Sequence, residues 1–269
     1  MKISVLLSAH NHTELVLDTI ESIRTYVSND LVMIVDEAHW GWGETINVAK
    51  IKGLYHNYNK APYRNLTLGL KTIYENNPNS DWYCYTEYDV LFTSSKFKED
   101  LKIAEENNVW CIGFDSRVQN YKFPYLEKII EGKLTQSRYL LGCCVFYHKD
   151  FLKKLYEMNF FDKFLTLTNG FEEGFFPNFE EQGGYDFGEH LYPTLANYFG
   201  KNTAEFSHWN QTLNQWQGNF QKYPVRWRPE IIHEEAMNNP SIIHPAKTME
   251  LRNFFKAKRY REWKVINQK

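Results

Sequence analysis

The chain has 269 residues, of which 43% are hydrophobic and 17% aromatic, and a formal net charge of −2 at pH 7. This length can bury the core of one large α/β domain, and the near-neutral charge excludes a generally cationic nucleic-acid binder. The apolar runs are shorter than the roughly 20 residues that a membrane-spanning helix needs. The N-terminal apolar run is also too short for a signal peptide, so we expect a cytoplasmic protein without transmembrane segments.

The cysteines are consistent with that location. They lie within apolar runs and lack the C-x-x-C spacing of a zinc or redox site. We therefore expect all four, Cys84, Cys111, Cys143 and Cys144, to be reduced core residues.

Two strand-like segments joined through a helix open the chain. Residues 3–8 form a short apolar run, Thr13 is the expected N-cap of the following helix, and residues 31–35 form a second buried strand that ends at Asp36 and Glu37. Strands joined through a helix are parallel, and ligands of such sheets gather outside the carboxyl ends of the strands. Both strands should therefore deliver polar groups to one edge of the sheet.

The most informative stretch is residues 82–92. It begins as a bulky aromatic run, typical of a strand buried on both faces, and ends in Glu87 and Asp89. In an extended chain these alternate side chains point the same way and converge beyond the end of the strand. Paired carboxylates suit magnesium or manganese, which takes its remaining ligands from water and substrate phosphates. The alternative is a strand that runs into a solvated acidic turn.

Further elements follow in order. We expect a helix over residues 95–107, a buried strand over 109–114, another over 140–147 and a helix over 150–158. After an irregular segment, a helix should begin near residue 185 and end near Gly200. Gly142 could let a substrate approach the backbone, or could mark an ordinary bulge.

Several of these segments together resemble family-2-type glycosyltransferases of the GT-A fold. Residues 5–11, 17–23 and 34–37 look like the opening of that family, and residues 63–70 are similar to its Arg-Asn-x-Gly-Leu helix start, with one residue inserted before Gly69. Residues 87–89 fall where the family keeps its Asp-x-Asp metal motif. The departure is Glu87 in place of the first Asp, which leaves open whether both acids contact the ion.

The resemblance implies an α/β fold, with a mixed, mostly parallel sheet flanked by helices in a single domain, residues 1–269. Residues 1–115 would bind the nucleotide sugar, 116–250 the acceptor, and 251–269 would form a basic C-terminal helix. The implied donor-binding residues are Ala9, His10, Asn11, Asp36, Arg64, Glu87, Tyr88 and Asp89.

The resemblance also implies a catalytic base. Glu189, or failing that Asp186, would take the proton of the acceptor in an inverting reaction. The alternative is that these acids only favour a helix N-terminus.

A late histidine is the third expected metal ligand. His244, in an Ile-Ile-His-Pro context, resembles the histidine that completes the metal shell in several GT-A enzymes, and His233 is the fallback. Trp209, Trp216 and Trp227 could stack on sugar rings or form a small satellite core. The basic C-terminal helix could make a peripheral contact with an anionic membrane or pack on the domain through its Phe residues, and we favour packing.

We therefore expect a glycosyltransferase that uses manganese or magnesium to move a sugar from a UDP- or GDP-type donor to a glycan or other hydroxyl acceptor. Two alternatives remain open. One is a sugar-nucleotidyltransferase, although residues 9–12 lack the Gly-rich basic signature of that class. The other is a non-catalytic carbohydrate-binding protein derived from the same fold.

Overall fold

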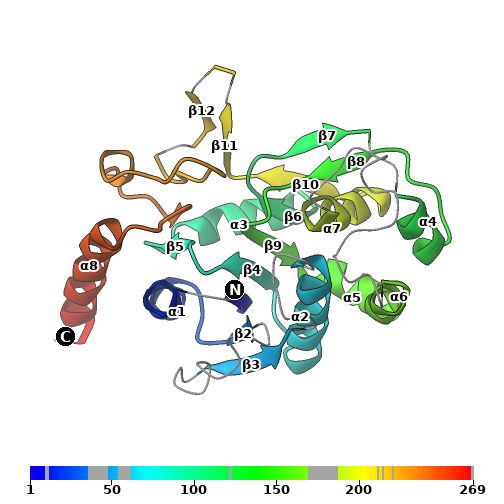
Figure 1. Ribbon diagram of the computed structural model, residues 1–269, viewed down its shortest axis with the longest axis horizontal. Helices are drawn as coiled ribbons and strands as arrows, with labels where there is room; N and C mark the ends of the chain where they lie inside the picture. The colour runs from blue at the N-terminus through cyan, green and yellow to red at the C-terminus, as the bar shows by residue number, and fades with distance from the viewer. Residues whose placement is uncertain are drawn as a thin grey trace.

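The computed structural model describes residues 1–9, 12–35, 48–53, 62–120, 123–168, 187–210, 212–213, 215–219 and 221–267. The centre of the fold is a seven-stranded sheet in the order β10-β6-β9-β4-β1-β2-β3 (Figure 1). Its strands are β1 (Ile3–Ala9), β2 (Leu31–Val35), β3 (Ala49–Lys52), β4 (Trp82–Glu87), β6 (Val109–Gly113), β9 (Cys144–His148) and β10 (Asn202–Glu205).

The sheet is mixed and mostly parallel. β1 pairs in parallel with β2 and β4, β2 with β3, and β10 with β6, whereas β9 runs antiparallel between β4 and β6. The predicted α/β fold with a mixed, mostly parallel sheet is thus confirmed.

Helices cover both faces of the sheet (Figure 1). One face packs against α1 (Thr13–Tyr26) and α3 (Phe97–Glu106). The other face packs against α2 (Pro62–Asn76), α4 (Pro124–Ile130), α5 (Lys149–Glu157), α6 (Phe160–Leu167) and α7 (Phe187–Tyr198). Most of the expected helices and strands are present with small shifts of their ends, but the strand expected over residues 140–147 begins only at Cys144, because residues 140–143 form a loop and turn before it. β3, β10, α4 and α6 are additions.

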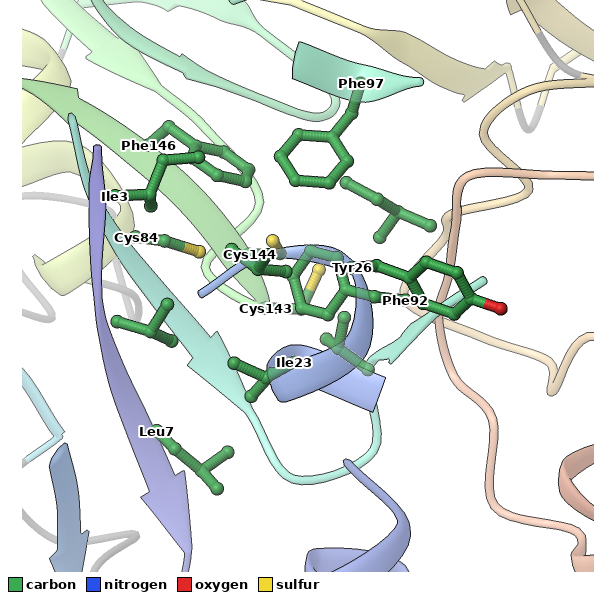
Figure 2. Close-up of a cluster of buried hydrophobic side chains, with 14 of the residues drawn as sticks. Ile3, Leu7, Ile23, Tyr26, Cys84, Phe92, Phe97, Cys143, Cys144 and Phe146 are labelled. Carbon is green, nitrogen blue, oxygen red and sulfur yellow. The ribbon is translucent and has the colours of Figure 1, made fainter. Parts of the chain in front are cut away.

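The central strand β4 shows why the sequence adopts this arrangement. Trp82 and Cys84 point into the cluster beside α1 and α3, whereas Tyr83 and Tyr85 point into the cluster beside α2 and α7. This alternation is that of a strand buried on both faces. Figure 2 shows the first cluster, with Cys84 among rings from α3 and β9 and the pair Cys143 and Cys144. All four cysteines are free and buried, as expected.

The start of α1 differs from the prediction. Thr13 is the first helical residue and not the N-cap. The cap is His12, in the left-handed region at φ 59°, because its carbonyl accepts the first helical hydrogen bond from Val16 N at 3.1 Å.

Shorter elements surround the sheet. They are β5 (Leu91–Phe92) paired with β13 (Ile242–Ile243), β7 (Arg117–Gln119) paired with β8 (Ser137–Tyr139), the hairpin of β11 (Ser207–Asn210) and β12 (Gln215–Gly218), and the short 3-10 helix η4 (Glu234–Ala236). The last helix, α8 (Met249–Asn267), lies beside α1 and buries Leu251 and Phe255, which agrees with the packing alternative (Figure 1). Within the part of the chain that the structure describes, no helix combines the length and apolarity required to cross a membrane.

The strand directions bring many strand ends to one edge of the sheet. The parallel strands end there, and β9 begins there because it runs the opposite way. The residues at this edge are Ala9, Val35, Lys52, Glu87, Gly113, Cys144 and Glu205. This is the edge at which open α/β sheets bind ligands.

Candidate functional site

A tight turn follows the central strand at this edge. Glu87 is the last residue of β4, and Val90 N donates to Glu87 O at 3.2 Å, which closes a turn through Tyr88 and Asp89 before β5 begins. The sequence analysis expected Glu87 and Asp89 to converge because they alternate along an extended chain. That reason is wrong, since the turn brings them together instead.

A second segment, residues 244–247, crosses this turn. Antiparallel pairing of β5 with β13 sets Ile243 opposite Leu91. The next residue, His244, then lies close to the turn, with Nε2 3.4 Å from Asp89 Oδ1. Ala246 N then donates to Asp89 O at 2.8 Å. Backbone hydrogen bonds therefore fix the position of the segment relative to the turn.

Glu87, Asp89 and His244 form a compact group of potential metal ligands. Each offers one ligand atom, and these atoms all lie within 4.8 Å of one another. Asp89 and His244 are buried and Glu87 is half-buried. The structure thus brings together the three residues that the sequence analysis assigned to a metal, although the assignment itself is still a proposal.

The orientation of these side chains suits a divalent cation. His244 Nδ1 lies 2.8 Å from the carbonyl oxygen of Arg226, which can only accept, so Nδ1 carries the proton. In the neutral imidazole, the lone pair is then on Nε2, which lies 3.4 Å from Asp89 Oδ1. Asp89 Oδ1 is buried without a hydrogen-bond partner. A buried, unsatisfied carboxylate oxygen beside an imidazole lone pair is a suitable ligand pair for a divalent cation.

The charges of the group are strongly coupled. Burial, together with the neighbouring charge of Asp89, raises the pKa of Glu87 to about 7. Burial also opposes ionisation of Asp89, but His244 and Lys247 outweigh it and hold the pKa of Asp89 below its ordinary value. For His244, burial disfavours the imidazolium, but Asp89, Glu87 and the Arg226 carbonyl outweigh this effect and raise its pKa.

The sequence analysis missed Lys247, which places a cation at the group. Lys247 Nζ lies 3.4 Å from Asp89 Oδ2, and its side chain is 45% exposed. Its ammonium group therefore reaches both the carboxylate and solvent. The available signal was weak: a lysine three residues after the histidine assigned to the metal.

The proposed base lies at the same edge of the sheet. Glu189, in the first turn of α7, accepts at Oε1 from Gly142 N at 2.5 Å. The next residue, Cys143, accepts at its carbonyl from Glu87 N at 2.9 Å. Two successive residues thus connect Glu189 to Glu87.

Gly142 has a steric reason to be glycine. A Cβ at this position would lie 2.9 Å from Glu189 Cγ, which is too close for carbon atoms. Glycine therefore lets the Glu189 carboxylate lie against the backbone. This close approach of Glu189 differs from both alternatives that the sequence left open, and the approach of a substrate to Gly142 stays a prediction.

The other predicted donor-binding residues are only partly described. Ala9 ends β1 opposite Val35, and Tyr88 stacks on His12 with ring centroids 5.7 Å apart. Arg64 is buried, and its Nη1 donates to Thr168 Oγ1 at 3.0 Å. His10, Asn11, Asp36 and Asp186 lie outside the described residues.

The remaining aromatic and histidine candidates lie on peripheral elements. Trp209 and Trp216 are register partners across the β11–β12 hairpin, which projects from the sheet in Figure 1. Trp227 is 65% exposed. The fallback ligand His233 packs its ring against Phe254, with centroids 4.7 Å apart, and is not in the metal-ligand group formed by the described residues.

Comparisons with known proteins return distant structural similarity. No protein-family model matches the chain, and no curated protein matches its sequence. Among solved structures, the chain is similar to the mannosyltransferase PcManGT from Pyrobaculum calidifontis in complex with GDP-Man and Mn²⁺, with a TM-score of 0.42 and 13% identity over 76% of this chain and 54% of that one.

Two further structures are similar at the same level. TarS from S. aureus has a TM-score of 0.35 and 13% identity over 57% of this chain. CMP:2-keto-3-deoxy-manno-octonic acid synthetase complexed with CTP has a TM-score of 0.41 and 9% identity over 77% of this chain and 89% of that one. The chain spans 29% of the length of TarS and 54% of PcManGT. Because this similarity is low, the function has to be argued from the residues of the chain itself.

Proposed function

We propose that the chain is a metal-dependent glycosyltransferase, which moves a sugar from a UDP- or GDP-type donor to a hydroxyl group of a glycan or similar acceptor. The observation that carries this proposal is the group of Glu87, Asp89 and His244, whose ligand atoms lie within 4.8 Å of one another where the central strand ends. Two carboxylates and one imidazole leave coordination positions for substrate phosphates. The sequence resemblance to family-2-type GT-A enzymes supports the same reaction.

Asp89 and His244 would hold manganese or magnesium, with Glu87 beside them. When bound, the ion supplies positive charge that stabilises the departing nucleotide diphosphate. Lys247 would add a second positive charge, because its ammonium group lies 3.4 Å from Asp89 Oδ2 and reaches solvent. We assign Lys247 to the phosphates of the donor.

The nucleoside would bind along the ends of β1 and β2. We keep Ala9, His10, Asn11 and Asp36 as the proposed contacts to base and ribose. Tyr88 would line the same side, since its ring stacks on that of His12. We also keep Arg64 as a proposed contact to the donor.

Glu189 would take the proton of the acceptor. As the acceptor oxygen bonds to the anomeric carbon, the bond from that carbon to the phosphate oxygen breaks, the diphosphate leaves with the electron pair, and the acceptor proton moves to the carboxylate. The hydrogen bond from Gly142 N at 2.5 Å fixes the orientation of Glu189. Attack from the opposite face of the sugar would invert the anomeric centre. If Glu189 is not the base, Asp186 is the alternative. The free, buried cysteines support a cytoplasmic location, which is part of the same proposal.

Nucleotide binding and product analysis test the proposal. UDP or GDP should stabilise the protein against heat only when Mn²⁺ is present, by about 2.7 kcal/mol at a hundredfold excess over Kd. The matching nucleotide sugar should then lose its sugar to water or to an added glycan. No metal-dependent binding of any nucleoside diphosphate would overturn the proposal.

The products separate the alternatives. A sugar-nucleotidyltransferase would instead release pyrophosphate from a nucleoside triphosphate and a sugar phosphate. A carbohydrate-binding protein would bind glycans without turning over any donor. The anomeric configuration of a transfer product would distinguish inversion from retention.

A further inference from the structure

The last helix of the chain contacts the backbone around the metal-ligand group through one buried arginine. We propose that Arg252, in α8, is a positioning residue that fixes the turn bearing Asp89 relative to the segment bearing His244. This inference rests on the proposed function in one respect only, that the group binds a divalent cation. It adds a residue from a helix that the sequence analysis treated as a packed basic extension.

The guanidinium of Arg252 bonds both parts of the site. Its Nε donates to Ala246 O at 2.6 Å, and its Nη2 donates to Tyr88 O at 3.2 Å. Tyr88 adjoins Asp89 in the turn, and Ala246 lies two residues after His244. A single planar group therefore spans the two backbone segments that carry the proposed ligands.

The same guanidinium is anchored on α1. Its Nη1 lies 2.9 Å from Asp18 Oδ2, 3.0 Å from Thr19 Oγ1 and 3.2 Å from Leu15 O. Thr19 Oγ1 in turn donates to Tyr88 O at 2.6 Å. Arg252 is 0% exposed, so these bonds form without competition from water. The fixed fork of an arginine matches this set of acceptors, whereas a lysine ammonium cannot reach all of them at once.

These hydrogen bonds should hold the ligand atoms of Asp89 and His244 at a fixed distance from each other. Asp89 and His244 belong to segments far apart in the chain, joined locally by the short β5–β13 pairing and the bond from Ala246 N to Asp89 O. Movement of either segment by about 1 Å would separate an ion from one of its ligands. Partners that orient metal ligands typically contribute about 10-fold to 100-fold to metal affinity. We expect Arg252 to contribute in this range.

Arg259 offers a matched control on the same helix. It lies about two turns further along α8 and is also buried, and its Nη2 bonds the other carboxylate oxygen of Asp18. Its second ion pair is with Glu21, at 3.6 Å. Arg259 thus shares the anchor of Arg252 without the bonds to Tyr88 and Ala246.

The test measures Mn²⁺ affinity of the full chain by calorimetry, at a temperature at which every variant is folded, alongside urea unfolding. Arg252→Lys and Arg252→Met should weaken Mn²⁺ binding about 10-fold to 100-fold. Arg259→Met should leave the Kd for Mn²⁺ within about twofold of the wild-type value, even if it lowers the free energy of unfolding as much as the Arg252 variants do. Thr19→Val, which removes one hydroxyl, is the milder variant if Arg252→Met does not fold, and it should weaken binding less but in the same direction.

The outcomes separate the two proposals. Wild-type Mn²⁺ affinity in Arg252→Lys and Arg252→Met would overturn the positioning role alone. Equal loss of affinity in the Arg252 and Arg259 variants would also overturn it, because a general effect of helix stability would then suffice. A wild-type protein that binds no Mn²⁺ would overturn the proposed function, and this inference with it.

Discussion

His244 and Asp89 lie against each other at the end of the β5–β13 pair, with Nε2 3.4 Å from Oδ1. The two residues come from distant parts of the chain, and each is held by backbone contacts on its far side: Asp89 O accepts from Ala246 N, and His244 Nδ1 donates to Arg226 O. Hydrogen bonds to backbone groups therefore help to hold the two side chains in place. Its proposed role as a metal-ligand pair can be tested residue by residue.

We expect Asp89→Asn to abolish metal binding while the protein still folds. The amide has the same shape but lacks the charge that attracts a cation, so the Kd for Mn²⁺ should rise by at least about 100-fold. Calorimetric titration measures this, with circular dichroism as the check on folding. Asp81→Asn is the matched control. Asp81 lies directly before the first residue of β4, at the other end of the strand from Asp89, and its Oδ2 accepts from Lys2 N at 2.8 Å. Unchanged Mn²⁺ binding by Asp89→Asn would refute the assignment of the metal to this turn.

His244→Gln should weaken Mn²⁺ binding by at least about 10-fold to 100-fold, since loss of a ligand should cost no less than loss of a partner that orients one. The glutamine amide can still donate to the Arg226 carbonyl, but it does not supply an imidazole lone pair to the ion. His233→Ala provides the comparison, since His233 also follows two isoleucines but packs on Phe254. Titrating both variants with Mn²⁺ should show loss only for His244→Gln. Loss in His233→Ala alone would favour the fallback ligand.

The general fold was predictable because it depends on local patterns. Apolar runs such as residues 31–35 and 82–87 identify buried strands, and helical spacing identifies α1. The antiparallel insertion of β9 between β4 and β6 was not predictable in this way, since strand order depends on contacts between residues distant in the sequence.

The residues of the candidate site were also predictable only where a local sequence pattern identifies them. Glu87, Asp89 and His244 were found because their residue types and local context resemble a known pattern, although the turn that joins the two acids was not foreseen. Lys247 and Arg252 were missed because their proposed roles rest on contacts with residues that are distant in the sequence. Lys247 has only the weak signal that it follows His244 by three residues, and Arg252 resembles any other basic residue of an amphipathic helix until its burial is known.

Mn²⁺ affinity should rise with pH through neutrality. Burial and the charge of Asp89 raise the pKa of Glu87 to about 7, and Asp89 and Glu87 raise that of His244 against the opposing effect of burial. Below neutral pH, the Glu87 carboxyl and the His244 imidazole therefore hold protons. A cation can bind these groups only after the protons leave, so acid weakens binding. Titrations from about pH 5.5 to about pH 8.5, in buffers of different ionisation enthalpy, should show proton release on binding. A pH-independent Kd without proton release would contradict this.

Lys247→Met should weaken the binding of a nucleoside diphosphate about tenfold, or about 1.4 kcal/mol, in the presence of saturating Mn²⁺. The reason is that the ammonium group, 3.4 Å from Asp89 Oδ2, would pair with the donor phosphates. Lys256→Met is the control, because Lys256 lies on α8 and pairs with Glu21. Competition binding with UDP and GDP measures the effect. Equal affinities in the two variants would remove Lys247 from the phosphate site.

Glu189→Gln should abolish transfer but spare binding. The amide retains the shape of the side chain and can accept from Gly142 N, but it cannot take the acceptor proton. General-base catalysis typically contributes about 100-fold to 10,000-fold, so kcat should fall by that factor while the Kd values for Mn²⁺ and nucleoside diphosphate stay constant. Glu205→Gln is the control, because Glu205 also accepts from a backbone N–H at this edge, that of Ser116 at 2.7 Å.

Gly142→Ala tests the same role from the other side of the contact. Its Cβ would lie 2.9 Å from Glu189 Cγ, so the glutamate must move away from the backbone that orients it. We expect kcat to fall about tenfold or more, with Mn²⁺ affinity little changed, since a displaced base loses alignment with the acceptor. Transfer assays at saturating donor with both variants measure this. If Glu189→Gln keeps more than about half of the wild-type kcat, Glu189 is not the base, and Asp186→Asn becomes the variant that must lose transfer.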